Sequence, residues 1–350
     1  MKNFSIMSEP AKIYPEMLRD IANAKNYVYL ETHQFDADAI GEKFKNLLIK
    51  KAKQGVKVRL LIDGYGSNAK KPYFNGLIKA GGEFKIFKEI TSIFFGFRKN
   101  NDRNHRKLLL IDDKISYVGS MNITASGISY RELVLRLTGN ITKILVHSFN
   151  KIWNLYGKIT PKKLKSLLHK NFEIIQDIPS YYFLATENKY KKLIKSAKKS
   201  ILIETPYFVP SKRILISLIK ASREGVNISI IIPYDSEIKL VNLVKERYLG
   251  RLYRNGINIY MYKRSLLHAK LLIIDDKFFM FGTSNVDYRS FFSQFEINFI
   301  GHDKEIIKGL KKHFGETMIK TEPFDYQEWR KRSSWRKLLE LILLRIRHFL

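Results

Sequence analysis

The chain of 350 residues (41.1 kDa) is longer than most single domains, and its 45% hydrophobic and 13% aromatic residues exclude a compositionally disordered protein. Its 63 lysines and arginines against 33 aspartates and glutamates give a net charge of +30, which favours polyanionic partners such as nucleic acid or an anionic membrane. Because the sequence contains no cysteine, disulfides, thiolate zinc sites and cysteine nucleophiles are excluded.

The first elements predicted along the chain alternate between strands and helices. An apolar run at 24–31 (AKNYVYLE) precedes an amphipathic helical pattern at 40–48. Further apolar runs follow at 54–63 (QGVKVRLLID) and at 80–88 (AGGEFKIFK). This alternation predicts an α/β unit with a largely buried sheet.

The fourth run, HRKLLLIDDKISYVGSMNI at 105–123, completes a pattern that the chain then repeats in the same order. Its counterpart at 268–286 reads HAKLLIIDDKFFMFGTSNV, and the three earlier runs recur at 197–204, 224–233 and 254–263. Four collinear matches do not arise by chance, so the sequence is a diverged duplication.

The duplication predicts the domain boundaries. We expect a first half at 1–155, a linker at 156–190 with a Lys-rich helical stretch at 161–170, and a second half at 191–325. The remaining residues, 326–350, form a basic amphipathic tail.

Each half carries the same chemical pattern, H-x-K-x4-D, followed by a Gly-led turn with a hydroxyl and an amide and then by an acid. In a strand, side chains two residues apart share a face, so the histidine and the lysine of each copy are expected to point the same way. The candidate catalytic residues are His105, Lys107, Asp112, His268, Lys270 and Asp275. The candidate supporting residues are Ser120, Asn122, Glu132, Thr283, Asn285 and Glu296.

Two copies of this set provide what phosphodiester transfer needs without a metal or a cofactor. One histidine can attack phosphorus while the other protonates the departing alcohol, and the lysines and asparagines can hold the phosphate oxygens. Each glutamate is expected to orient the imidazole of its own half, Glu132 for His105 and Glu296 for His268. No dense carboxylate cluster suggests a Mg²⁺ or Ca²⁺ site.

Two pairs of residues have a second interpretation. Asp112 and Asp275 each open a DDK turn, so turn chemistry explains them as well as catalysis does. His33 and His302 lie outside the repeated pattern and are predicted to be surface residues.

The duplicated motif with its Gly-Ser or Gly-Thr turn and asparagine resembles the signature of the phospholipase D superfamily. Within it, GTSNVDYRSFFSQFEINF at 282–299, ETPYFVP at 204–210 and LLHAKLLIIDD at 266–276 look like segments of bacterial cardiolipin synthases. The resemblance covers roughly residues 10 to 325. The sequence departs from many relatives in lacking two N-terminal membrane helices and in reading GSMN in its first motif.

This resemblance implies a pseudo-twofold, duplicated phospholipase D-like fold. It would have two sandwich halves with mixed, mainly parallel sheets flanked by helices, and a single active site between the halves. The implied activity is transfer of a phosphatidyl group between two phosphatidylglycerols, which makes cardiolipin and releases glycerol. By analogy His105 is the nucleophile and forms a phosphohistidine.

Three alternatives remain open at this stage. Water could be the acceptor, which would make the protein a phospholipase. The charge of +30 would suit a nuclease or DNA-end phosphodiesterase, and a non-catalytic relic could bind nucleic acid or membrane. The two intact motif copies disfavour the non-catalytic relic. The aromatic tail and the lipid-family segments disfavour the nuclease, so we expect phospholipid rather than nucleic acid as the partner.

The expected location is the cytoplasmic face of the inner membrane, in peripheral contact. The chain has no apolar run of signal-peptide length and no 18 consecutive apolar residues. The tail at 335–350 places apolar residues on one helical arc and suits a bilayer surface, although it could instead dock on the core or on a partner chain. The aromatic segment at 90–99 is a second candidate for membrane contact, although it could equally be a buried loop. The proposed membrane-binding residues are Trp335, Leu338, Leu339, Ile342, Ile346 and Phe349.

Overall fold

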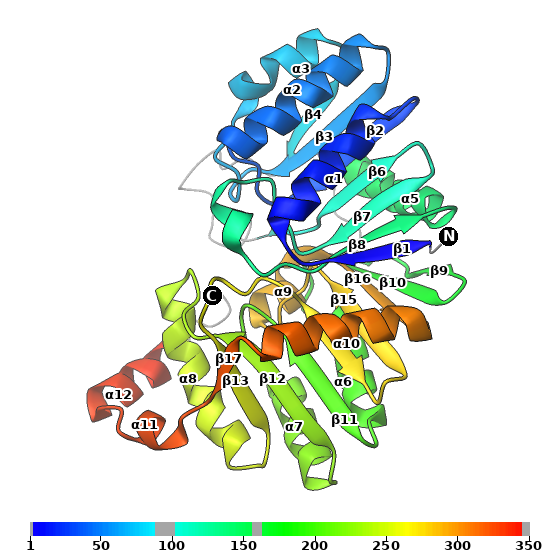
Figure 1. Cartoon of the computed structure of the whole chain (residues 1–350). Coiled ribbons are helices and arrows are strands. Elements are labelled where there is room, and N and C mark those ends of the chain that lie inside the picture. The colour runs from blue at the N-terminus through cyan, green and yellow to red at the C-terminus, as the bar shows by residue number, and fades with distance from the viewer. Residues whose placement is uncertain (1–2, 88–101, 156–162, 345–350) are drawn as a thin grey trace. The chain divides into compact units, whose positions relative to one another are not determined.

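The computed structural model describes residues 3–87, 102–155 and 163–344 (Figure 1). The chain divides into two compact units. The first comprises Met1–Lys162 together with Phe295–Ile297, and the second comprises Lys163–Gln294 together with Asn298–Leu350. Each unit is built around its own sheet.

The first unit contains a seven-stranded sheet in the order β1-β8-β7-β6-β2-β3-β4. The pairs β2–β3 and β3–β4 are parallel, and the four other pairs are antiparallel. The strands are β1 (Phe4–Met7), β2 (Tyr27–Thr32), β3 (Lys57–Asp63), β4 (Glu83–Phe87), β6 (Leu108–Ile111), β7 (Ile115–Gly119) and β8 (Val134–Thr138). A short strand, β5 (Arg103–Asn104), pairs with β16 (Gln294–Gly301), of which Phe295–Ile297 belong to this unit.

Helices cover both faces of this sheet because its strands are apolar on both sides. Val28 and Leu30 of β2 join the buried cluster under α1 and α2, whereas Tyr29 between them stacks on Phe149 of α5 at 5.1 Å. The helices are α1 (Pro10–Ala22), α2 (Ala39–Lys53), α3 (Asn75–Lys79) and α5 (Ile141–Leu155), with 3-10 turns η1 (Lys71–Phe74) and η2 (Ser126–Ser129).

The start of α2 illustrates how the sequence sets the helix ends. Asp38 is the N-cap, and its carboxylate accepts hydrogen bonds from the N–H groups of Ile40 and Gly41 at 2.9 Å each. Basic residues occupy the last turn, where they complement the helix dipole.

The second unit repeats this arrangement. Its sheet runs β17-β13-β12-β11-β14-β15-β16-β10-β9, and the stretch from β13 to β10 matches the order from β4 to β1 in the first unit. Its remaining strands are β9 (Leu167–His169), β10 (Phe172–Asp177), β11 (Ser200–Glu204), β12 (Asn227–Pro233), β13 (Asn258–Tyr262), β14 (Leu271–Ile274), β15 (Phe278–Gly282) and β17 (Thr321–Pro323). The predicted duplication is therefore confirmed.

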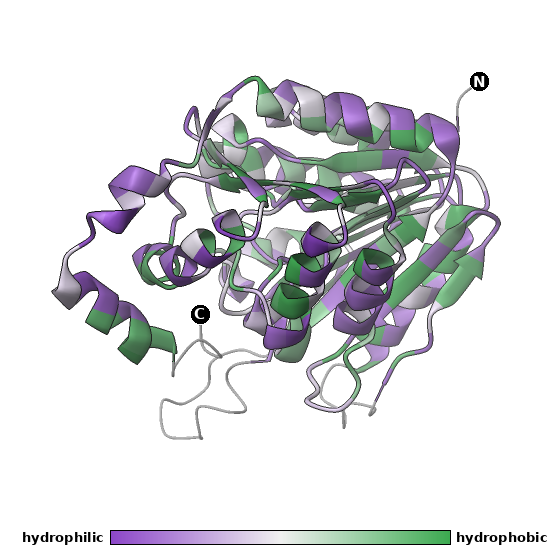
Figure 2. Cartoon of the chain, turned by 90° about the horizontal axis from the view of Figure 1, so that it is seen from below, coloured by the Kyte–Doolittle hydropathy of each residue, from purple (hydrophilic) through white to green (hydrophobic). Residues whose placement is uncertain are grey.

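Seven helices of the second unit lie within the described residues. They are α6 (Ala185–Ser196), α7 (Lys212–Arg223), α8 (Lys239–Tyr253), α9 (Tyr288–Phe292), α10 (Lys304–Met318), α11 (Tyr326–Arg330) and α12 (Ser334–Leu343). Ile201 and Ile203 of β11 belong to the buried cluster that α6, α7 and α8 cover. In Figure 2 the strands are mostly green and the helices carry both colours, as expected for buried sheets flanked by amphipathic helices.

Two details differ from the expectations. The sheets are mixed as predicted, but each contains only two parallel pairs among the strand pairs whose direction is described. These are β2–β3 and β3–β4 in the first unit and β11–β12 and β12–β13 in the second. The sheets are therefore not mainly parallel, because each DDK turn makes an antiparallel hairpin of the two strands that follow the H-x-K segment.

The predicted linker at 156–190 is the second difference. Its described part contains β9 and β10 and the start of α6, so most of it belongs to the second unit and corresponds to β1 and α1 of the first. The helix predicted at 161–170 is wrong at Leu167–His169, which form β9. Lys170 turns the chain into β10 with φ of 47°.

Candidate functional site

The Gly-led turn of the first unit brings a hydroxyl against a carboxylate. Gly119 ends β7 with φ of 150°, and a Cβ there would meet the carbonyl oxygen of Leu133 at 2.1 Å, so only glycine fits. This close approach buries Ser120, whose Oγ accepts from the N–H of Leu133 at 2.9 Å and donates to the carboxylate of Glu132. The turn therefore fixes Glu132 from the side of the serine.

His105 is held by residues that lie far away in the sequence. Its backbone N–H donates to the carbonyl of Phe295 at 3.0 Å, and its Nδ1 lies 3.0 and 3.2 Å from the two carboxylate oxygens of Glu296. Both side chains are buried, His105 being 6% exposed and Glu296 fully buried. The expected pairing of His105 with Glu132 is therefore wrong, because the acid of the second motif occupies that place.

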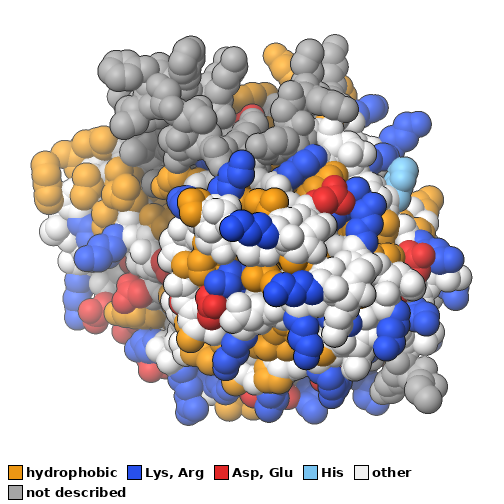
Figure 3. All heavy atoms as spheres, turned by 90° about the horizontal axis from the view of Figure 1, so that it is seen from above, with side chains coloured by type: hydrophobic (Ala, Val, Ile, Leu, Met, Phe, Trp, Pro, Cys, Tyr) orange, Lys and Arg blue, Asp and Glu red, His pale blue; other side chains and the backbone are white. Residues whose placement is uncertain are grey.

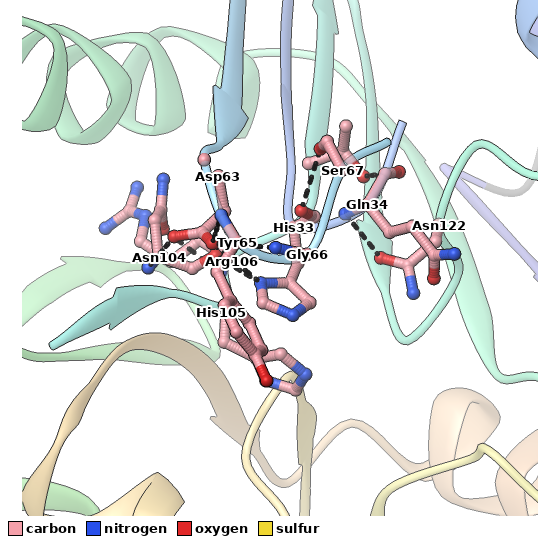
Figure 4. Close-up of polar contacts among 12 residues, drawn as sticks. His33, Gln34, Asp63, Tyr65, Gly66, Ser67, Asn104, His105, Arg106 and Asn122 are labelled. Atoms are coloured by element: carbon pink, nitrogen blue, oxygen red, sulfur yellow. Dashed lines mark hydrogen bonds and ion pairs between the residues drawn. The ribbon is translucent and has the colours of Figure 1, made fainter. Parts of the chain in front are cut away.

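A second histidine lies beside His105 and was not expected there (Figure 4). The ring centroids of His33 and His105 are 5.0 Å apart with the rings at 70°, and His33 Nδ1 lies 2.9 Å from the carbonyl oxygen of Asn104. Gly66 supports this position, because a Cβ there would meet His33 Nε2 at 2.7 Å. His33 is therefore part of the candidate site. By contrast, His302 is exposed as predicted.

A sequence signal for His33 existed in the repeat itself. ETHQF at 31–35 and ETPYF at 204–208 stand at the same place after β2 and β11, and their phenylalanines bridge to equivalent residues of the two motifs. The repeat shows that this segment reaches the motif turn in both units. Pro206 stands at the position of His33 in the second unit and has no ionisable group. The role of the histidine is therefore particular to the first unit.

Asp63 anchors the backbone on which this pair of histidines rests. Its carboxylate accepts from the N–H groups of Asn104 at 2.9 Å, Tyr65 at 2.9 Å and Gly66 at 3.1 Å. Burial raises the pKa of Asp63, and these N–H donors and nearby Arg103 only partly oppose that effect. The carboxylate therefore ties together the residue before His105 and the glycine under His33.

The residue between His105 and Lys107 points elsewhere. Arg106 is fully buried, with Nε 3.1 Å from Glu31 Oε1, and its guanidinium donates to Ser148 Oγ of α5 at 2.7 Å. In the second unit Ala269 replaces the arginine, and the equivalent carboxylate of Glu204 lies 3.2 Å from Nε2 of His313 in α10. The same buried acid is thus faced by different basic side chains in the two units.

The motif lysines adopt the same conformation in both units. Lys107 Nζ donates to the carbonyl of His105 at 2.8 Å, and Lys270 Nζ donates to the carbonyl of His268 at 2.7 Å. Both lysines are buried, and each precedes its strand rather than lying within it. Each ammonium is therefore fixed next to its motif histidine. His268 itself is half-buried.

The asparagines and the Thr of the motif turns are also buried or half-buried. Asn122 Oδ1 accepts from the N–H of Gln34 at 3.3 Å, and the N–H of Asn285 donates to Ser290 Oγ at 3.0 Å. Thr283 is fully buried. Among the described residues, Asn285 Oδ1 has no hydrogen-bond donor, so this buried oxygen is unsatisfied.

Asp112 and Asp275 lie at the opposite end of their strands from the histidines. Each adopts φ of 53° and accepts hydrogen bonds from three consecutive backbone N–H groups, of residues 25–27 and of residues 198–200, at 2.6 to 2.9 Å. Although burial acts to raise it, these N–H donors hold the pKa of Asp275 below its usual value. The geometry agrees with the structural interpretation of both aspartates, since each carboxylate caps a neighbouring segment of backbone.

The tail only partly follows its prediction. Trp335, Leu338 and Ile342 are exposed, whereas Leu339 packs partly against the core. Ile346, Phe349 and the segment 90–99 lie outside the described residues. Across residues 3–87, 102–155 and 163–344, no helix is both long enough and apolar enough to cross a bilayer.

Known proteins match this chain along most of its length. A family model described as cardiolipin synthase, PLD-like domain, matches residues 17–153 and 190–318. The major cardiolipin synthase of Bacillus subtilis is 32% identical over 345 residues, which cover 94% of this chain and 71% of that protein. A cardiolipin synthase of Clostridium perfringens is 32% identical over 355 residues, with 95% and 73% covered.

Solved structures agree on the fold. A phosphatidylserine synthase of Haemophilus influenzae superposes with a TM-score of 0.79 over 100% of this chain and 96% of its own, at 14% identity. A polyphosphate kinase of Porphyromonas gingivalis reaches 0.63 over 99% and 53%, at 12% identity. These likenesses concern the fold, while the family model and the two closer sequences identify the family. The chain belongs to the cardiolipin synthase family of proteins with the phospholipase D-like domain.

Proposed function

We propose that this phospholipase D-type phosphatidyltransferase makes cardiolipin from two phosphatidylglycerols, releases glycerol, and works through a phosphohistidine on His105. The cardiolipin synthases that resemble it over more than nine-tenths of the chain support the substrate class. The observation that carries the mechanism is the contact of His105 Nδ1 with Glu296 at 3.0 Å. A carboxylate at Nδ1 sets the tautomer that leaves the electron pair of Nε2 for attack.

In the first step His105 Nε2 forms a bond to the phosphorus of one phosphatidylglycerol, and the bond from phosphorus to the glycerol oxygen breaks. The imidazolium of His268 gives its proton to the departing glycerol. In the second step the hydroxyl of another phosphatidylglycerol returns a proton to His268. The oxygen of that hydroxyl attacks phosphorus, and the bond between phosphorus and Nε2 of His105 breaks.

The fixed cations and amides of both motifs supply the electrostatic part of the proposal. Lys107 and Lys270 keep their ammonium groups beside the motif histidines, and Asn122 and Asn285 contribute amide groups. Donors fixed in advance stabilise the charge that develops on the phosphoryl oxygens without reorganising during the reaction. We assign a supporting role to Ser120 and to its counterpart Thr283, which are buried in the motif turns.

The proposed location is peripheral contact with the cytoplasmic face of the inner membrane. The lipid substrates require the protein to reach a bilayer, and its charge of +30 suits anionic headgroups.

The test is lipid analysis by thin-layer chromatography after incubation with phosphatidylglycerol in detergent. We expect cardiolipin and glycerol from the intact protein and none from His105→Ala or His268→Ala, both with unchanged circular dichroism. Quenching in acid-free conditions should trap phosphate on His105. Phosphatidic acid as the sole product would replace the transferase with a hydrolase, and cleavage of an oligonucleotide without lipid turnover would replace the lipid substrate.

A further inference from the structure

Helix α12 packs Leu339 and Leu343 against the core together with buried Glu340, and leaves a second row of apolar side chains in solvent. Towards α8, Glu340 is fully buried and pairs with Arg332 at 2.8 Å, and Arg336 lies 3.4 Å from Glu246. On the opposite side four large apolar side chains are exposed, and Figure 3 shows hydrophobic side chains gathered at the left edge, where α12 lies in Figure 1. They are Trp335 (70% exposed), Leu338 (47%), Leu341 (44%) and Ile342 (53%).

An ordinary surface helix buries its whole apolar stripe against the core, whereas α12 buries only Leu339, Leu343 and Leu344 there and exposes its other large apolar residues. At 100° per residue the four exposed side chains span an arc of about 120° that contains no charged residue of the described helix. Burying a carboxylate and exposing a tryptophan is unfavourable for a protein surrounded by water alone. The arrangement is favourable when an apolar phase covers the exposed arc.

A basic groove borders the C-terminal end of this helix. It is a cavity of about 370 Å³ lined by Lys212 at the start of α7 and by Arg247, Arg251 and Arg254 along α8. Leu344, the C-cap of α12, lines the same groove, so the apolar arc and the groove are contiguous. Among the described residues that line the groove there is no carboxylate.

The three arginines follow one another at i, i+4 and i+7, a spacing at which like charges repel on a helix. In the described part of the chain no carboxylate forms an ion pair with any of them; Arg254 Nε donates only to the carbonyl of Gly250. Buried Tyr248 and Tyr288 form part of the wall. A concave site with four cations and no acid matches a phosphodiester group, which guanidinium groups bind in bidentate fashion.

We propose that the tail surface, meaning Trp335, Leu338, Leu341 and Ile342 with Lys212, Arg247, Arg251 and Arg254, docks on a bilayer that contains anionic phospholipid. The groove receives the phosphate of a lipid headgroup, and the apolar arc of α12 enters the layer between headgroups and acyl chains. The inference rests on the proposed function in one respect, because the substrates proposed there reside in such a bilayer.

A second copy of this chain is a less suitable occupant. A dimer formed through the apolar arc would be isologous, with the same patch on both partners. The groove that borders the arc would then come close to its own copy, and four cations would face four cations. An anionic bilayer satisfies the apolar arc and the basic groove together.

The experiment measures binding to vesicles of phosphatidylcholine with and without phosphatidylglycerol by flotation. The double variant Leu338→Ser with Ile342→Ser should bind both kinds of vesicle about tenfold more weakly. The double variant Arg247→Gln with Arg251→Gln should lose the preference for phosphatidylglycerol and with it the sensitivity to salt. All four residues are exposed, so the melting temperature should stay unchanged.

Matched controls lie in the same unit. Ile319→Ser removes an apolar side chain that is 85% exposed, and Lys308→Gln with Lys312→Gln removes two charges at i, i+4 of α10. Both controls should bind vesicles like the original protein. Equal loss in the controls and in the tail-surface variants would overturn the proposal, because it would show binding by charge and hydrophobicity in general.

Tryptophan fluorescence gives an independent measurement. Trp153 is buried and Trp329 stacks under Arg332, so a blue shift on adding vesicles belongs to Trp335 and should disappear in Trp335→Phe. A sedimentation coefficient that falls in Leu338→Ser with Ile342→Ser without lipid would overturn the proposal in favour of a dimer. Because binding needs no turnover, a protein that binds vesicles but makes no cardiolipin would overturn only the proposed function.

Discussion

At the scale of single residues, contacts to both the backbone and the imidazole ring fix the orientation of His105. The backbone N–H is fixed by Phe295 and the ring by Glu296, and His33 packs edge-on against the imidazole. A ring held in this way loses little entropy when it attacks, since its rotamer is set before substrate binds. The position of a residue in β16 therefore controls the proposed nucleophile.

Replacing Glu296 with glutamine tests this control. Glutamine keeps the size of the side chain but removes the charge that stabilises the imidazole in its working tautomer, so kcat should fall by about 10² to 10⁴ with a small change in KM. Rapid-quench measurement of phosphate on His105 should show that the formation step is the one slowed. Normal formation of the phosphohistidine in Glu296→Gln, with slow formation in Glu132→Gln, would show instead that Glu132 orients His105.

The aspartates of the DDK turns are expected to affect stability rather than chemistry. Asp112→Ala and Asp275→Ala each remove the acceptor of three N–H groups at a residue with φ of 53°, so each should lower the free energy of unfolding by about 2 to 4 kcal/mol. Asparagine tolerates this conformation and keeps one acceptor, so Asp112→Asn should lose less. Urea unfolding measures both effects. A loss of kcat per folded molecule with unchanged stability would return these residues to catalysis.

The sequence allowed the motif residues to be selected but not all of their partners. The histidines, lysines and aspartates were found because the duplication repeats them at fixed spacings. The pairing of His105 with Glu296 could not be predicted, because 191 residues separate them and the spacing of each motif suggests a local partner. His33 was missed because its counterpart, Pro206, has no comparable chemistry.

At the scale of secondary-structure elements, β10 and α6 are joined by a buried polar network. Asp177 at the end of β10 accepts from the N–H and the hydroxyl of Thr186 in α6, and Thr186 Oγ1 also accepts from Asn298 of β16 at 2.9 Å. Burial raises the pKa of Asp177 to about 6, although the hydrogen bonds from Thr186 oppose this shift. The network therefore has a protonation state that depends on pH near neutrality.

The sign of this dependence follows from linkage. The folded pKa of Asp177 is above its unfolded value, so the stabilisation by this group is complete below about pH 4 and is lost as pH rises through about 6. Asp177→Asn mimics the protonated form at every pH. The unfolding free energy of the original protein minus that of Asp177→Asn should fall by about 2 to 3 kcal/mol between pH 4 and pH 7, measured by urea unfolding. A difference that does not change with pH would contradict this account.

Two glycines within helices give opposite expectations for the same substitution. A Cβ on Gly250 of α8 would meet the ring of Trp329 at 2.0 Å, whereas a Cβ on Gly315 of α10 would meet nothing within 4 Å. Gly315→Ala should stabilise the protein by about 0.5 to 1 kcal/mol through helix propensity. Gly250→Ala should displace α11 from α8, lower the melting temperature and expose the tail to protease. Similar shifts in both variants would show that Trp329 does not hold the tail.

The strands and helices of the two halves were predictable wherever the hydrophobic period was clear, as in β3 and α2. The segment before α6 was not, because its many lysines resemble a solvated helix and the strand β9 is only three residues long. The orientation of α12 could not be predicted either, and the structure shows Leu339 and Leu343 packed against the core. The helical pattern identified its apolar arc, but only the structure shows that Glu340 is on the buried side.

For the molecule as a whole, two sheets with the same strand order follow from one duplicated sequence, and the comparison of the halves shows what the duplication preserves. The acid near the end of β2 and of its counterpart β11 is buried in both units, as Glu31 and Glu204. Its partner is an arginine beside the motif histidine in the first unit and a histidine of α10 in the second. A basic side chain therefore faces the buried acid in both units, although the two units use different residues for it. The two basic partners come from different positions in the two halves, so the equivalence is seen in the structure and not in the repeated sequence.

The last prediction concerns how this strongly basic chain neutralises the charge of its reaction. In the proposed mechanism Lys107 and Lys270 provide positive charge next to each histidine, and the net charge of +30 raises the local concentration of anionic substrate. We therefore expect the formation of cardiolipin in detergent to be undiminished by excess chelator. Lys107→Met and Lys270→Met should each lower kcat/KM by at least about tenfold, since each removes a fixed cation. A chelator-induced loss that one divalent ion restores would show that a metal, rather than these lysines, provides the stabilising charge.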